Sequence, residues 1–541
     1  MKDMRKYKTS CIYCRNVFSR GAQGFIATVL LMAALAAGVP RSVSAQERQL
    51  NAADMECAKP TEGYGQAVLG ADFETGTFHR AQDAATKTGI FFNADGERQV
   101  GRFYLKGDFR FRQSFENDVR FASTFNPLRA MPYVIADSTG GNWKKQSYAM
   151  WADISTPIVK GLLNAGLAMD LDVGRGAKKI DPRPQAGMCR IEIKPSLSFS
   201  FLNRLSASAG FIYGLYRETS NLILYDSSQP QKLYLLKGLG QYTYEVFSST
   251  ERERKYEGTT LGGSLNIRNT NSFGVISLYG DYRNGLEKVF DIDYNKPHDR
   301  GNYYTHDFRA GLSLDAPREG SARRGTEMKI EYSGLRHSGR EFVQHFDSSP
   351  RVNGWVTDSE LPGRYTNRED HVSGDVRFFL NDRNALRKSW VFSAAAEWNR
   401  CEQNYSAAGA RELIRNMRLA LGMQKIIRTR GGVLDLGCLA RISRGLGSHL
   451  DYTPRETDDT HIAVDLIDHD FALPSNWHYI RLEAGYIWNL KHERALSLNA
   501  STFFKSSERD RRSKGESGLE IDSAPGRWWR SGCLLSVGLR F

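Results

Sequence analysis

The sequence alternates apolar and polar side chains with a period of two, in one segment after another. Residues 190–201 place an apolar side chain at almost every second position, and after a short turn residues 205–215 do the same. Successive side chains of a β-strand point to opposite faces, so this is a hairpin with one apolar and one polar face. The same pattern recurs at 102–112, 163–173, 307–314, 327–332, 372–380 and 480–490.

Strand length and loop pattern favour a membrane barrel over a soluble sandwich. Many strands run about 10 to 13 residues, whereas soluble strands average about 5–6. Trp390 and Trp398 bracket one apolar face, and eight residues span roughly 26 Å along a strand. After the strand tilt this is about 20 Å, near the height of a lipid band between two aromatic girdles. Short turns alternate with connections that we expect to be long polar loops, near 114–145, 218–254, 338–367, 446–476 and 506–527.

The number of alternating segments predicts the size of the barrel. We count sixteen candidate strands from Gly101 onward, and an even count puts both chain ends on the periplasmic side. Within the N-terminal segment 46–100, residues 64–95 either add one hairpin, making eighteen strands, or fold inward. The predicted fold is all-β: a transmembrane antiparallel up-and-down β-barrel over residues 101–541. A mean hydropathy of −0.48 does not argue against it, because lipid-facing and lumen-facing residues cancel in the average.

Residues 1–45 have the layout of a secretory signal peptide. A basic stretch precedes the apolar run Phe25–Val39, and Val43-Ser44-Ala45 supplies small residues for cleavage before Gln46. The run is too short for a comfortable transmembrane helix. Cleavage lowers the net charge from +13 to +7, because the segment holds seven basic residues and one acidic residue. No basic stripe with interleaved aromatics indicates nucleic-acid binding. Cys57 and Cys401 could pair after export, although nothing in the sequence requires it.

The last strand alternates apolar residues from Trp529 to the terminal Phe541. Such an unpaired amphipathic end can pair with another strand edge, and it resembles the signal read by the β-barrel assembly machinery. Together with Ser44-Ala45-Gln46 and the glycine-rich and aromatic hairpins, this ending resembles uncharacterised outer-membrane β-barrel proteins common in Bacteroidetes. The resemblance implies an outer-membrane location and a barrel architecture, but no reaction.

The polar faces hold the candidate functional residues. Arg102, Lys106, Arg110 and Arg112 form a basic stripe on one strand, and Asp170 and Asp172 lie on another. These lumen-lining candidates either create a transverse field that sorts permeants by charge or pair with each other and fill the lumen. The loop at 446–476 is rich in Asp and His, which we interpret as a solvated loop in preference to a metal site. We find no catalytic motif and no cofactor-binding motif, and expect no resident metal or cofactor.

Four functions fit a barrel of this size. We favour a passive pore for small solutes, because 16–18 strands are wide enough for an aqueous channel. An energised receptor fits less well, since about 50 residues between Gln46 and Gly101 are too few for a plug domain. A surface-binding or secretion-accessory barrel and, less so, a rim-located hydrolase stay open. The expected partners are outer-membrane lipid, lipopolysaccharide and the assembly machinery.

Overall fold

The computed structural model describes residues 63–541 with gaps. The gaps are 202–203, 227, 229, 248–250, 273, 294, 317–323, 383–384, 453–475, 491–493 and 509–526. The predicted signal peptide, Cys57 and most of the Asp- and His-rich loop therefore lie outside the described residues.

The described chain is built from β-strands. In chain order they are β1 (Tyr64–Gly76), β2 (Thr86–Val100), β3 (Phe103–Val119), β4 (Ile135–Ala136), β5 (Gly141–Val159), β6 (Leu163–Lys178), β7 (Arg183–Phe201), β8 (Leu205–Ile223), β9 (Gln231–Gly238), β10 (Gln241–Phe247), β11 (Glu251–Asn271), β12 (Gly274–Asp293), β13 (Lys296–Asp315), β14 (Arg324–Asp347), β15 (Gly354–Asp382), β16 (Ala385–Tyr405), β17 (Ala410–Arg428), β18 (Gly432–Asp451), β19 (Trp477–Asn489), β20 (Ala495–Glu508) and β21 (Arg527–Arg540).

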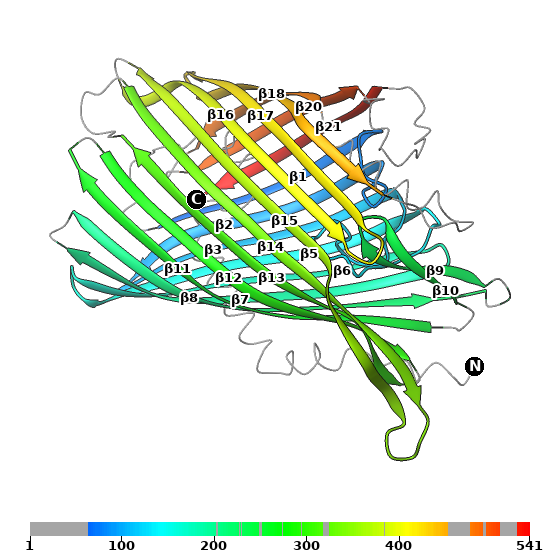
Figure 1. Ribbon diagram of the computed structural model, residues 1–541. Coiled ribbons are helices and arrows are strands. Elements are labelled where there is room, and N and C mark those ends of the chain that lie inside the picture. Colours follow the sequence, from blue (N-terminus) through cyan, green and yellow to red (C-terminus); the bar gives the residue numbers. More distant parts are fainter. Residues whose placement is uncertain are drawn as a thin grey trace, which may run out of the picture.

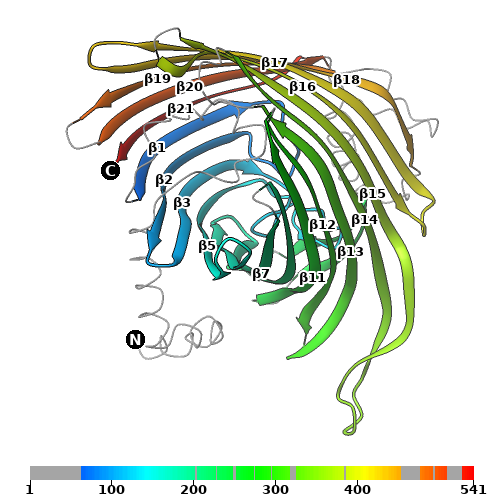
Figure 2. The same ribbon diagram turned by 90° about the vertical axis from the view of Figure 1, so that its left-hand side faces the viewer.

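Eighteen of these strands form one closed antiparallel sheet (Figures 1 and 2). Each strand pairs with its neighbour in the wall, and β1 pairs with β21 to close the ring. At the seam, Gly65 and Phe541 exchange two backbone hydrogen bonds of 2.8 Å. The all-β barrel is thus confirmed. Its wall has the sixteen strands counted after Gly101, and the hairpin of β1 and β2 joins the wall instead of folding inward.

The outer face of the barrel is apolar. Leu69, Ile330 and Leu421 are between 58 and 66 % exposed, although each lies in the middle of a strand. Exposed large apolar side chains in continuous rows indicate a surface that meets lipid. The free cysteines Cys189 and Cys533 lie in the same outward register. Within the described residues, no helix is long and apolar enough to span a membrane.

One expected loop is instead a strand hairpin. The prediction of a long loop at 338–367 is wrong, because β14 and β15 stay paired up to Asp347 and Gly354. This hairpin extends beyond the other strands (Figure 1). Phe346 and Trp355 pack edge to face across it, with ring centroids 5.5 Å apart. Such a cross-strand aromatic pair adds to the stability of a hairpin. The sequence pattern missed this hairpin because its strands have no continuous apolar face.

Candidate functional site

The longer connections lie at one end of the barrel, which we call the loop end, and the short turns lie at the other, the turn end. Two of the connections at the loop end fold back into the lumen. The connection between β3 and β5 supplies β4, and the connection between β8 and β11 supplies β9 and β10. These three strands form a separate sheet, in the order β10-β9-β4, which we call the plug sheet. Ile135 and Ala136 pair with β9, and the amide of Leu236 donates to the carbonyl of Val134 over 2.8 Å.

The plug sheet packs against tyrosines of the inner wall. They share two properties: each points into the lumen, and each is at most 5 % exposed. They form one apolar cluster with plug residues that include Tyr133 and Leu236. The wall tyrosines of this cluster are Tyr256, Tyr303, Tyr365 and Tyr405.

Tyr133 reaches the wall because two glycines leave room for it. A Cβ atom on Gly301 would lie 2.7 Å from the Tyr133 ring, and one on Gly339 would lie 2.2 Å from its hydroxyl oxygen. Real Cβ atoms do not approach this closely, so the seat of Tyr133 requires glycine at both positions. Burial raises the pKa of the Tyr133 phenol far above its usual range, so it stays neutral in the plug.

Arg129 anchors the first inserted segment through a buried charge cluster. Its guanidinium binds both carboxylate oxygens of Glu287, over 2.7 and 2.8 Å, and lies 3.8 Å from Glu218. The rings of Tyr216 and Tyr256 lie 4.7 and 4.9 Å from the guanidinium carbon. The Glu218 side chain is fully buried, and only 18 % of the Arg129 side chain is exposed. Removing Arg129 would leave Glu218 and Glu287 buried in the wall without this nearby cation.

Further ion pairs fix the two inserted segments to the wall. Lys178 at the end of β6 donates to both oxygens of Asp137, over 2.8 and 2.9 Å, and to the carbonyl of Thr139. Lys237 of β9 binds Glu341 over 2.9 Å, and the hydroxyl of Tyr405 donates to the same carboxylate. Both segments are therefore held by polar contacts that could break and re-form, in addition to apolar packing.

A third, shorter connection, residues 77–85, supports the plug from the side. The Gln82 amide donates to the carbonyl of Phe121 over 2.9 Å. Asp83 binds Lys87 at 2.5 Å and lies 3.6 Å from Arg530. Burial opposes ionisation of Asp83, but these two cations outweigh it and lower the pKa of the carboxyl below its ordinary value.

A cavity of about 470 Å³ lies between the inserted segments and the inner wall of β15 to β17. Hydrogen-bonding side chains line its wall in a row: the Asn399 amide receives a contact from His371 and donates to Asn416 over 2.9 Å. Charges of both signs also border it, including Arg418, which lies 3.5 Å from Glu397 of the wall. Such a chamber can hold one small polar molecule. No cluster of three metal-binding side chains occurs in the part of the chain that the structure describes.

The lumen-lining candidates lie on the opposite side, on β3 and β6. Lys106 binds Glu97 over 3.0 Å, Arg110 lies 3.5 Å from Asp108, and Arg112 binds Asp72 over 2.7 Å. Asp170 binds Lys194 over 2.7 Å, and Asp172 binds Arg190. Arg102 is in the turn before β3, 5.3 Å from the Phe103 ring. Apart from Arg102, the candidates thus sit among opposite charges rather than as a bare basic stripe.

The plug sheet was missed because its two segments were expected to be polar loops, and that prediction is wrong. Residues 131–136 and 233–236 are almost entirely apolar and buried. Tyrosines also stand on the polar faces of β13, β15 and β16. A lumen that held only water would not bury apolar side chains, so apolar loops opposite inward aromatics were the available signal.

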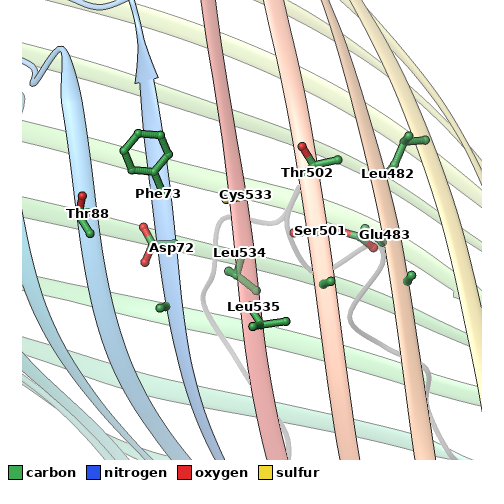
Figure 3. A pocket seen from close by; sticks show the side chains of 13 residues that line it. Asp72, Phe73, Thr88, Leu482, Glu483, Ser501, Thr502, Cys533, Leu534 and Leu535 are labelled. Carbon is green, nitrogen blue, oxygen red and sulfur yellow. The ribbon is translucent and has the colours of Figure 1, made fainter.

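A second concavity, of about 620 Å³, lies on the outer face of β1, β2 and β19 to β21 (Figure 3). Phe73, Leu482 and Leu535 border it and are 43 to 54 % exposed. Small residues such as Ala71 and Ala500 leave the depression between them. Because it lies on the apolar outer face, it is not on a path through the lumen.

The closed eighteen-stranded ring, its apolar exterior and its polar, partly filled interior define an outer-membrane type of β-barrel. Residues 52–538 match the model of a family of unknown function, DUF6850, and the chain belongs to that family. A search of curated protein sequences finds no match.

The matches among solved structures include an outer-membrane transporter. The FrpB iron transporter from Neisseria meningitidis is 10 % identical, with 89 % of this chain and 82 % of that chain covered and a TM-score of 0.38. The outer-membrane transporter YddB from Escherichia coli is 6 % identical. The match covers 88 % of this chain and 81 % of that chain, with a TM-score of 0.37. A FadL homologue from Pseudomonas aeruginosa is 11 % identical. The match covers 89 % of this chain and 90 % of that chain, with a TM-score of 0.28. These low identities and scores leave the activity of this chain open.

Proposed function

We propose that the protein is a passive outer-membrane channel for small polar solutes, with a lumen narrowed by its own inserted loops. The observation that carries this is the plug sheet standing beside a polar cavity in a barrel of eighteen strands. A ring of this size leaves an aqueous channel unless something fills it. The plug sheet then sets which solutes pass, and the polar cavity beside it is a binding point on their route.

The lining of the cavity supports polar solutes of low net charge. Asn399 and Asn416 offer amide donors and acceptors, while cations and carboxylates border the same space. A strongly selective field for one sign of charge needs a ring of like charges. The paired charges on β3 and β6 argue in the same direction.

The proposal includes a cellular location. The protein is exported from the cytoplasm of a Gram-negative cell, of the Bacteroidetes kind that the resemblance suggests, by a signal peptide spanning residues 1–45. It enters the outer membrane by presenting its last strand, ending at Phe541, to the assembly machinery. The proposal assigns no reaction to the chain.

Swelling of proteoliposomes tests the passive channel. Vesicles that carry the refolded protein should swell in neutral sugars and zwitterionic amino acids without any ion gradient or inner-membrane partner. Asn416→Leu removes an amide from the cavity wall and should slow swelling severalfold, whereas Met417→Leu on the lipid face should not. No swelling with any solute, together with electrical silence in planar bilayers, would rule the channel out.

A surface-binding role is the second candidate, and the projecting hairpin of β14 and β15 favours it. Twenty-four and twenty-nine residues exceed what a membrane crossing needs, so the outer part stands in solvent. Replacing residues 343–357 by a tight turn should then abolish capture of a partner and leave conductance unchanged. Unaltered capture would exclude this hairpin as the docking element.

A further inference from the structure

The outer surface of β14 to β18 changes character along a single row of residues. Tyr332, Val372, Trp398 and Met417 lie directly opposite one another on these neighbouring strands. Val372 and Met417 are 39 and 40 % exposed, and apolar residues continue from this row toward the turn end of the barrel. Tyrosine and tryptophan in such a row mark the boundary between hydrocarbon and headgroups.

Arginines occupy the outward positions at and beyond this boundary, toward the loop end. We call them the arginine patch: Arg336, Arg368, Arg400, Arg411, Arg415 and Arg444. Their outward direction follows from the alternation along each strand. Arg400 lies two residues beyond Trp398, and Arg444 is opposite Met417 in the boundary row itself.

The register sets like charges side by side. Arg336 lies directly opposite Arg368, and Arg400 directly opposite Arg415. Like charges in directly opposed positions of a sheet repel each other and lower its stability. A fold that places two such pairs on adjacent strands gains from an anion bound between them.

The carboxylates of the patch do not balance it. Asp370 contacts Arg336 and Arg368, and Glu402 binds Arg400 and Arg411 over 2.8 and 2.7 Å. A third acid, Asp451, lies opposite Arg411 and binds His449 over 2.9 Å. Six arginines against three carboxylates leave three positive charges in excess. Arg415 and Arg444 are exposed and have no acidic partner among the described residues.

We propose that the arginine patch binds the phosphate groups of lipid A in the outer leaflet. Guanidinium groups bind phosphate through two parallel hydrogen bonds, which makes arginine suited to this headgroup. The patch lies beside the aromatic row, at the depth where headgroups meet the barrel. Five strands at about 4.8 Å spacing give it a width of roughly 19 Å, enough for more than one phosphate. The choice of the outer leaflet rests on the proposed function, in which the protein lies in the outer membrane with its loop end facing outward.

Native mass spectrometry of the full-length refolded protein in detergent tests the patch. The probes are diphosphorylated lipid A and the same lipid without its phosphates. The triple variant R368Q/R411Q/R415Q should bind lipid A at least about tenfold more weakly than the wild type. The matched control R217Q/K255Q/K288Q removes three outward cations near the loop end of β8, β11 and β12 and should bind normally. The dephosphorylated lipid should not be retained.

Several outcomes would overturn the proposal: equal binding by the patch variant, an equal loss in the control, or equal retention of dephosphorylated lipid. If the glutamine variant does not fold, R368K/R411K/R415K keeps the charge and should retain most of the binding, while the single exposed change R415Q should weaken it severalfold. Wild-type binding by R415Q would then refute the role of the patch. Conductance does not depend on these residues, so failure of the patch and failure of the channel are separable.

Discussion

Replacing Arg129 by methionine should open the channel. With the inserted segment in place, its guanidinium pairs with Glu287, lies 3.8 Å from the fully buried Glu218 and packs between two tyrosine rings. Removing one partner of a buried ion pair costs about 3–5 kcal/mol, because the remaining charge is left buried without it. We take the lower figure, about 3 kcal/mol, since part of Arg129 still meets water in the lumen.

This energy affects the position of the inserted segment more than the stability of the barrel. The wall keeps its inter-strand hydrogen bonds in either state, whereas Glu218 and Glu287 regain water only when the inserted segment moves away. A loss of about 3 kcal/mol changes the ratio of closed to open lumen roughly 100-fold, at 1.4 kcal/mol for each factor of ten. The open probability of R129M should rise accordingly.

Single-channel recording in planar bilayers measures that open probability. R120M is the matched control, because Arg120 belongs to the same connection but is half exposed and pairs with Asp118, which is also half exposed. It should behave as the wild type. The variant R129M/E218Q/E287Q should return toward the closed state, since it leaves no charge buried alone. If R129M and R120M have the same open probability, Arg129 does not hold the plug and the reasoning fails.

The remaining predictions concern the wall, the plug and export. Leu278→Arg puts a charge on the lipid face and should lower the free energy of unfolding by about 2–4 kcal/mol, whereas Ser277→Arg on the lumen face should be tolerated. Urea unfolding followed by gel mobility measures both variants. An equal loss of stability in the two would contradict the assigned faces. The pKa of Asp83 is lowered in the fold, so its contribution is present above the unfolded value near 3.9 and is lost as pH falls through the folded pKa. Asp83→Asn should therefore reduce the fall in urea midpoint between pH 6 and pH 3, and an unchanged slope would remove Asp83 from the account. Gly339→Val should expel Tyr133 and expose residues 120–140 to proteolysis while the barrel band stays intact; protection equal to the wild type would show that the seat is not needed. N-terminal sequencing of the exported protein should begin at Gln46, and a start elsewhere would correct the predicted cleavage site.

The barrel wall could be predicted from the sequence because its signal is local. In β7 and β8, side chains that face lipid and side chains that face the lumen alternate within one strand, and short turns fix the register. The hairpin of β1 and β2 was harder, because Gly70 and Gly89 interrupt its alternation on the lumen face. Its membership of the wall depends on pairing with β21, more than 400 residues away in sequence.

The plug could not be predicted in the same way, because it depends on contacts between distant segments. Tyr133 meets Gly339, and Arg129 meets Glu287, about 200 and 160 residues further along the chain. No local sequence pattern predicts that an apolar connection turns into the lumen instead of associating with lipid. Likewise, Arg110 and Asp170 could be assigned to the polar faces, but their ion-pair partners follow only from the observed register.

The most direct test of the central claim is the steady conductance of a variant in which residues 231–247, β9 and β10, are replaced by a short glycine–serine linker. The wall of eighteen strands does not include these residues, so the variant should still fold and show heat-dependent gel mobility. If the inserted loops narrow the lumen, its conductance should be large and constant, while the wild type opens rarely or conducts little. Equal conductance in the two proteins would contradict a lumen narrowed by its own loops.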